Sequence, residues 1–235
     1  IAALMDEAKA GLSAQLEAFA VNTSQFMNRE RALLLDGVGI PDVRTPLTGR
    51  HVLVVVRGYD HEAELKALKH YIREFKPVMI GVDGGADTLL DAGHKPHMIV
   101  GDMDAVSDAA FGTGAEVVVR THPDGRASGL ARVQDLGVDP VVFAASGTSE
   151  DAAILLADHN NADLIVAVGA HATLTEFLDK GRSGMASTFL TRLRVGDKLI
   201  DARGASRLYR NRISAAALLI LVLAALIAVV AALAI

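Results

Sequence analysis

Short apolar runs alternate with longer amphipathic stretches between residues 51 and 202. The apolar runs are rich in β-branched residues and have the length of strands; they cover residues 51–56, 78–82, 97–100, 116–120, 140–144 and 163–168. The stretches between them predict helices near residues 60–75, 86–92, 106–111, 126–136, 149–159 and 173–180. Nearly continuous apolar strands separated by helices are typical of a parallel sheet covered on both faces. The pattern therefore predicts an α/β fold over residues 51–202 with a doubly wound, mostly parallel sheet, completed by a short helix and an edge strand.

The first 36 residues (1–36) predict one long N-terminal helix, since proline is absent and apolar residues recur every seven positions. These heptad positions are Met5, Leu12, Phe19, Phe26 and Leu33. Two interpretations of these apolar positions remain open. The helix packs either on its own domain or on a preceding domain, or it forms a homodimer. The following segment, residues 37–50, contains two prolines and three glycines, which indicates a linker.

The last 22 residues, 214–235, carry no charged side chain. As a helix this run would be about 33 Å long, enough to cross the roughly 30 Å hydrocarbon layer of a bilayer. A basic segment, residues 203–213, precedes it and contains Arg203, Arg207, Arg210 and Arg212. Positive charge beside a membrane helix stays on the cytoplasmic side. We therefore expect a transmembrane helix in a single-pass protein of the cell inner membrane, with the membrane as partner and the α/β domain in the cytoplasm.

Composition narrows the classes of function. Acidic residues outnumber basic ones by 28 to 23, and the formal net charge of -5 argues against nucleic acid as a partner. Cysteine is absent, which excludes thiolate zinc sites, iron-sulfur clusters and thiol nucleophiles. The sequence also lacks a G-x-S-x-G elbow for a serine nucleophile. The chain begins at Ile1 rather than methionine, and we expect it to be part of a longer protein.

Acidic and glycine residues follow two neighbouring predicted strands, where open parallel sheets bind ligands. After residues 78–82 come Asp83, Gly84 and Gly85, and paired glycines let a backbone approach a ligand closely. After residues 97–100 come Asp102 and Asp104, whose carboxylates point the same way in extended geometry. Two hard oxygen ligands, supported by Asp83 or Asp151, suit Mg²⁺ that holds a polyphosphate. The structural alternative for these residues is a tight turn.

A run of small and hydroxyl residues precedes the predicted helix 149–159. It consists of Ser146, Gly147, Thr148 and Ser149. The free N–H groups and the dipole of a helix start attract a phosphate group, so this run is a second part of the candidate nucleotide site. A helix cap is the alternative role for Ser149 and for an aspartate at a helix start. His122 and His171, near two strand ends, are weaker candidates for ligand contact.

The run VDGGADTLLDAGHKPHMIVGDMDAVSD, residues 82–108, resembles the nucleotide-binding half of the thiamine pyrophosphokinases. That family has a DGGA turn, a G-D-x-D-S strand end whose acidic residues bind Mg²⁺ with ATP, and a later D-x-T-D motif at a helix start. The resemblance implies that Asp83, Asp102 and Asp104 take the acidic positions. Asp151 takes the last position of the third motif. The implied cofactors are Mg²⁺ and ATP or another phosphorylated ligand.

More closely, the assembly resembles the SteA-like cytokinetic ring proteins of actinobacteria. These proteins combine a pyrophosphokinase-like domain, the segment GRSGMASTFLTRLRVGDKLIDA (residues 181–202) and a membrane helix. The resemblance covers nearly all of residues 36–235. It implies a role in cell division and cell separation, with a membrane or divisome protein as partner.

Departures from the pyrophosphokinase pattern bear on activity. Thr148 stands where the third motif has its first aspartate, and Glu150 stands where it has threonine. The C-terminal β-sandwich that helps form the thiamine pocket has no room between residue 202 and the apolar run. We therefore expect a membrane-anchored nucleotide-binding protein without kinase turnover. The alternatives are an active ATP- and Mg-dependent pyrophosphokinase and a scaffold whose cleft has lost its ligand.

Overall fold

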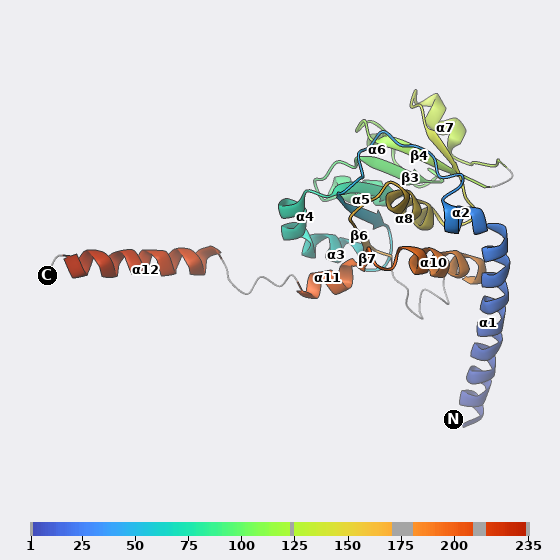
Figure 1. Ribbon diagram of the computed structural model, residues 1–235, viewed down its shortest axis with the longest axis horizontal. Helices are drawn as coiled ribbons and strands as arrows, with labels where there is room; N and C mark the ends of the chain where they lie inside the picture. The colour runs from blue at the N-terminus through green and yellow to red at the C-terminus, as the bar shows by residue number, and fades with distance from the viewer. Residues whose placement is uncertain (1, 123–124, 171–180, 209–214, 234–235) are drawn as a thin grey trace.

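A single parallel sheet organises the molecule (Figure 1). The computed structural model describes all residues except 1, 123–124, 171–180, 209–214 and 234–235. Within the described residues the sheet has seven strands: β1 His51–Val56, β2 Val78–Val82, β3 Met98–Gly101, β4 Glu116–Thr121, β5 Val141–Ala144, β6 Leu164–Val168 and β7 Leu199–Asp201. The first six lie within one residue of the predicted runs at each end. The α/β fold with a parallel sheet is thus confirmed.

The strand order is β5-β4-β3-β2-β1-β6-β7, and every neighbouring pair is parallel. Strands β1 to β5 therefore lie side by side in sequence order. The chain then crosses back to β1, and β6 and β7 lie on its other side. The carboxyl ends of β1 and β6 consequently form a topological switch point, where loops leave in opposite directions and ligands of such sheets bind.

Helices cover both faces of the sheet, as a doubly wound fold requires. On one face α2 (Arg31–Asp36), α8 (Ser149–His159) and α10 (Gly181–Val195) cover a core that includes Val54, Ile80 and Val100. The other face is covered by α3 (His61–Ala67), α4 (Lys69–Phe75), α5 (Gly85–Asp91), α6 (Asp108–Phe111), α7 (Leu130–Asp135) and α11 (Ala202–Leu208). Successive residues of each strand point alternately into the two cores. This explains why the strands are apolar throughout.

The N-terminal segment contains two helices where one was predicted. α1 (Ala2–Arg29) and α2 (Arg31–Asp36) are separated by one residue, Glu30. The second half of α1 packs on α10 of the same chain, with Phe26 in a buried cluster and Phe19 edge-to-face against Phe189 at 5.7 Å between ring centroids. The first half of α1 extends beyond the body of the domain (Figure 1). Packing on its own domain is therefore the interpretation that the structure supports for the second half of the helix.

Four further segments differ from the expectations or cannot be compared with them. The helix predicted over 60–75 is divided into α3 and α4 at Leu68, and the helix predicted over 173–180 lies outside the described residues. The basic segment includes residues 203–208 of α11, in which Arg203 pairs with Asp60 at 2.9 Å. α12 (Ala215–Leu233) follows. None of the helices, as far as their residues are described, is long and apolar enough to cross a membrane, so the transmembrane helix is not confirmed.

Candidate functional site

A cavity of about 730 Å³ lies at the carboxyl ends of the strands, beside the switch point. We call it the strand-end cavity. Residues at the ends of β1 to β6 line it together with residues of α8 and α10. The charged and hydroxyl side chains among them belong to Arg57, Tyr59, Asp83, Asp102, Arg120, Ser146, Thr148, Ser149, Glu150 and Ser187. Seven of the ten predicted site residues line it: Asp83, Gly84, Asp102, Ser146, Gly147, Thr148 and Ser149. The other three, Gly85, Asp104 and Asp151, do not.

The paired glycines after β2 have different environments. A side chain at Gly85 would overlap the carbonyl oxygen of Val55, so glycine is required for α5 to approach β1. At Gly84 an added Cβ would lie 2.9 Å from the guanidinium carbon of Arg57, the end of a flexible side chain. The left-handed residue of the turn is Asp83, with φ of 46°. Gly85 thus serves helix packing, while Gly84 and Arg57 border the cavity.

Asp83 connects the ends of two strands. Its Oδ1 accepts a hydrogen bond from the backbone N–H of Met103 at 3.1 Å, and the hydroxyl of Ser149 also donates to its carboxylate. Burial raises the pKa of Asp83 above its usual value, and the charge of Asp102 acts in the same direction, against these hydrogen bonds. The carboxylate therefore fixes the loop after β3 in addition to lining the cavity.

The two carboxylates after β3 point to different surroundings, which corrects the extended geometry that we expected. Met103 has φ of 69° and its side chain is buried in the core, so the backbone turns between the two aspartates. Asp102 lies at the cavity and contacts Arg120 through both oxygens, at 2.7 and 2.8 Å. Asp104 is exposed and accepts a hydrogen bond from the hydroxyl of Ser128 at 2.7 Å.

Arg120 is a site residue that the sequence analysis did not identify. It occupies an inner position of β4 and is 7% exposed. Its Nη1 donates to the carbonyl oxygen of Ala145 at 3.2 Å, and its Nη2 contacts Asp102. Its Nε is buried and has no hydrogen-bond partner among the described residues. A charged residue directly after the apolar residues 117–119, near the carboxyl end of a predicted strand, was the signal in the sequence that could have identified it.

The start of α8 is capped from within the chain. Thr148 and Asp151 form a capping box, in which the Asp151 N–H donates to Thr148 Oγ1 at 3.1 Å and the Thr148 N–H donates to Asp151 Oδ2 at 3.0 Å. Ser187 of α10 also donates to Asp151, at 2.6 Å. Burial, followed by the charge of Glu150, raises the pKa of Asp151 to about 6. Asp151 therefore has the capping role that was the structural alternative.

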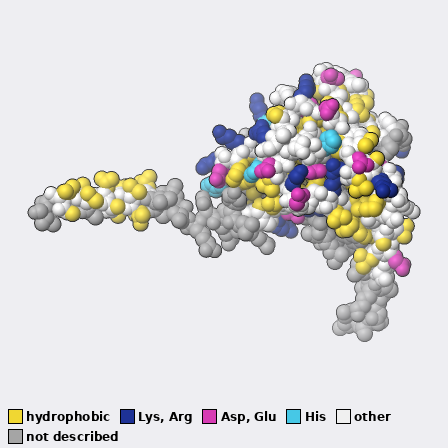
Figure 2. Space-filling model, in the orientation of Figure 1, with side chains coloured by type: hydrophobic (Ala, Val, Ile, Leu, Met, Phe, Trp, Pro, Cys, Tyr) yellow, Lys and Arg dark blue, Asp and Glu magenta, His cyan; other side chains and the backbone are white. Residues whose placement is uncertain are grey.

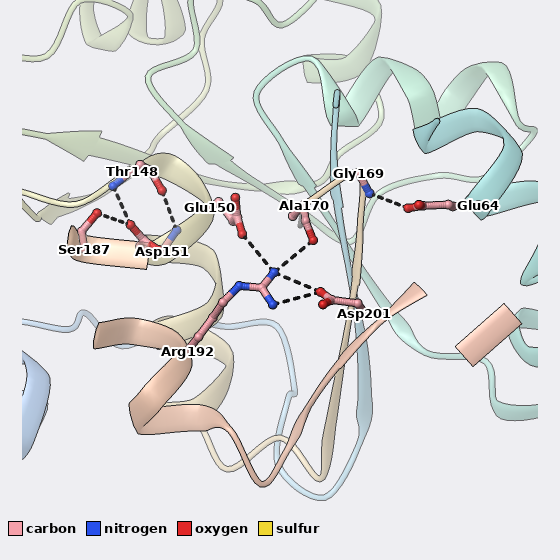
Figure 3. Close-up of polar contacts among 9 residues, drawn as sticks. All are labelled: Glu64, Thr148, Glu150, Asp151, Gly169, Ala170, Ser187, Arg192 and Asp201. Atoms are coloured by element: carbon pink, nitrogen blue, oxygen red, sulfur yellow. Dashed lines mark hydrogen bonds and ion pairs between the residues drawn. The ribbon is translucent and has the colours of Figure 1, made fainter. Parts of the chain in front are cut away.

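Arg192 of α10 forms a second arginine cluster, which Figure 3 shows beside the capping box. Its Nη1 and Nη2 each donate to Asp201 at 3.0 Å, and Nη2 also donates to the carbonyl oxygen of Ala170 at 3.0 Å. Glu150 lies 3.7 Å from the same Nη2. This cluster connects α10, α8, the end of β6 and β7, so Glu150 serves the packing of these elements at the position where the pyrophosphokinase motif has threonine.

The carboxylates that were expected to bind Mg²⁺ do not form a metal site. Asp102 is paired with Arg120, Asp104 accepts from Ser128, and Asp151 caps α8. Over the described part of the chain, no three His, Asp or Glu side chains are grouped so as to hold a metal ion. The residues present therefore do not fit the cation that the resemblance implies.

Two further predictions concern residues around the cavity. Ser146 lines it, but its hydroxyl donates to Glu30 at the junction of α1 and α2. His122 lines it as predicted, and His171 lies outside the described residues. Arg57 was missed by the sequence analysis, although its place directly after the first predicted strand was a signal. It lies 4.0 Å from Asp87 and keeps half of its side chain exposed.

The comparisons with known proteins concern two parts of the chain. Residues 203–235 match the SteA-like C-terminal domain. The match confirms the resemblance to SteA-like proteins for this segment. No curated protein matches the chain. Among solved structures, the chain is similar to thiamine pyrophosphokinase from Bacillus subtilis, with 20% sequence identity and a TM-score of 0.38. That similarity covers 64% of this chain and 60% of the pyrophosphokinase, less than two thirds of its length.

Proposed function

We propose that this protein binds ATP or another phosphorylated ligand in the strand-end cavity and acts in cell division and cell separation, anchored in the membrane and without kinase turnover. The observation that carries the proposal is the cavity itself. Its volume of about 730 Å³ lies in the range of small-molecule sites, roughly 300–1,000 Å³. It stands at the switch point of a parallel sheet, the usual place for a ligand in this class of fold.

The chemistry of the cavity wall favours an anionic group. The first N–H groups of α8 have no carbonyl partner within the helix, and they carry the positive end of its dipole. Arg57 and Arg120 add two guanidinium groups. Three carboxylates also line the cavity, but Asp102 is neutralised by Arg120, and burial raises the pKa of Asp83. A phosphate is the group that uses both the helix start and the guanidinium groups.

The absence of turnover is proposed because the motif positions for metal and acceptor have other uses. Thr148 caps α8, and Glu150 lies in the Arg192 cluster. Phosphoryl transfer relies on positioned metal ions and charges, so binding can persist after these groups are lost.

Membrane attachment and the role in division rest on the C-terminal segment. Residues 203–235 match the SteA-like domain, and the described side chains of α12 are apolar and exposed (Figure 2). The uncharged run 214–235 would enter the bilayer, and the α/β domain would then lie in the cytoplasm. Retention of the full chain in membranes washed with alkaline carbonate tests the attachment. Release into the wash would contradict it.

Calorimetric titration of the full chain, in detergent, with ATP tests the ligand. Heat of binding to wild type supports the proposal, and its loss when the cavity is altered would place the ligand there.

Release of AMP from ATP in the presence of thiamine tests turnover. AMP formation above the rate without protein would favour the alternative, an active pyrophosphokinase. Failure of ATP and of inorganic pyrophosphate to bind would instead favour a scaffold, and the search would move to protein partners. Delayed separation of daughter cells without this protein tests its role in division.

A further inference from the structure

We propose that Arg120 holds the ligand's phosphate directly, in place of Asp102 and without a divalent cation. The proposal rests on the proposed function, because it names how the same cavity recognises its ligand. It gives Asp102 the role of an exchangeable partner of the arginine, where the sequence pattern suggested a metal ligand.

The hydrogen bonds of Arg120 are the first evidence. Its side chain is 8% exposed and lines the cavity. Both oxygens of Asp102 contact one nitrogen, Nη2, while Nε has no partner among the described residues. Nε and Nη2 form one edge of the planar guanidinium group, and this edge matches two oxygens of a phosphate. A phosphate that accepts from both nitrogens would therefore satisfy a donor that Asp102 leaves unused.

The start of α8 supplies the second, independent contribution. α8 has 11 residues, and Ser149 and Glu150 at its first positions line the same cavity as Arg120. The capping box uses the N–H groups of Thr148 and Asp151, and the helix gives the N–H groups of its first residues no internal acceptor. A phosphate between Arg120 and this helix start would gain the guanidinium contact and the helix dipole together.

Asp102 is placed so that it can leave. Its side chain is 39% exposed, so water can solvate the carboxylate once it turns away from Arg120. Its carboxylate carries one negative charge, and a terminal phosphate carries up to two, so the phosphate is the stronger partner for the guanidinium group. Asp83 and Glu150 also face the cavity, and they oppose any anion equally whether or not Asp102 is present.

The sign of one mutational effect separates this proposal from a metal site. If Asp102 competes with the ligand, Asp102→Asn removes the competitor and tightens binding by about tenfold, which corresponds to one charged contact. If Asp102 binds Mg²⁺, the same substitution weakens binding. Arg120→Lys keeps the charge but loses the two-nitrogen edge, and we expect binding weakened by about tenfold or more.

The test is calorimetric titration of the full chain with ATP and with inorganic pyrophosphate, each with excess EDTA and again with Mg²⁺. We expect binding in EDTA that is at least as tight as with Mg²⁺, which neutralises part of the ligand's charge, and tighter binding to Asp102→Asn in EDTA. The matched control is Asp108→Asn, which removes a carboxylate paired with Arg132 at 2.5 Å outside the cavity lining. Its affinity should equal that of wild type.

Two results would overturn the proposal, and they differ in what else they affect. Binding that requires Mg²⁺ and is weakened by Asp102→Asn would reject it and leave the proposed function standing. Absence of binding to both wild type and Asp102→Asn would reject it together with the ligand of the proposed function. Asp102→Asn keeps this test decisive even if Arg120→Lys unfolds, because Asp102 is partly exposed and an asparagine there fills nearly the same volume.

Discussion

Two arginines at the carboxyl edge of one sheet, Arg120 with 8% and Arg192 with 15% of its side chain exposed, have similar chemistry and different surroundings. Each contacts an aspartate, 39% exposed beside Arg120 and 37% exposed beside Arg192, and each has an Nε without a partner among the described residues. Arg120 borders the strand-end cavity, whereas Arg192 does not line it and also faces the buried Glu150. Arg192 therefore stabilises the fold through two carboxylates, whereas Arg120 has one partly exposed carboxylate partner at a cavity, which is why we propose that it is available to a ligand.

The largest effect that we predict is on the Arg192 cluster. Arg192→Met removes the guanidinium group that lies 3.7 Å from Glu150, which is 5% exposed, and it removes a donor to the carbonyl oxygen of Ala170. Breaking a buried pair in this way costs about 4 kcal/mol. Urea unfolding of the wild type and the variant measures the difference in free energy of unfolding.

Arg44→Met is the control for this loss. Arg44 lies 3.5 Å from Glu116 but its side chain is 83% exposed, so its removal should change the free energy of unfolding by less than about 1 kcal/mol. Equal effects of the two substitutions would show that Arg192 does not have the structural role assigned here.

Asp151, next to the Arg192 cluster, gives the second prediction, which concerns pH. Its folded pKa, about 6, lies above the usual 3.8, so the folded state holds a proton that the unfolded state has released. Its contribution to stability is therefore complete below pH 3.8 and decreases as the pH rises to about 6, by roughly 3 kcal/mol in total. Urea unfolding at several pH values should show this decrease in wild type and not in Asp151→Asn. Parallel curves for the two proteins would refute the assignment.

The sheet was predictable because each strand is buried on both faces. Residues such as Val54 and Leu53 face opposite cores, so their strand appears as an uninterrupted apolar run with turn residues at its ends. Interruptions of helices were less visible. Glu30 and Leu68 divide predicted helices, and both residues are compatible with a helix interior, so only the packing of the neighbouring segments explains the breaks.

The site was predictable in its location and less so in its contacts. Strand ends placed Asp83, Asp102 and the 146–149 run at one edge, and the structure brings these to one cavity. The direction of Asp104 was not predictable, because Met103 adopts a left-handed φ that the sequence does not require. Arg120 was missed because it is 25 residues before its acceptor, the carbonyl oxygen of Ala145, in the sequence. Long-range pairs of this kind depend on the fold.

Arg120→Met, the counterpart of Arg192→Met, gives the third prediction. Asp102 is left partly exposed and can be solvated, and methionine fills the buried volume of the arginine stem. We expect the free energy of unfolding to fall by about 1–2 kcal/mol, because the carbonyl oxygen of Ala145 loses a donor while Asp102 can be solvated, and we expect ATP binding to be lost. Urea unfolding and calorimetry on the same variant measure both. A loss of stability as large as that of Arg192→Met would remove the distinction between the two arginines.

The smallest effect that we predict concerns the contact between the N-terminal helices and the cavity. Glu30 accepts a hydrogen bond from Ser146, which lines the cavity, and its side chain is 11% exposed. Glu30→Gln keeps an acceptor but removes the charge, so we expect a loss of less than about 1 kcal/mol in unfolding free energy. Hydrogen exchange of the amides at 146–150 should become faster in the variant, because this loop is connected to α1 and α2 through that contact. Unchanged exchange there, with binding of ATP also unchanged, would show that the N-terminal helices and the cavity are independent, and that the loop is ordered by the capping box of α8 alone.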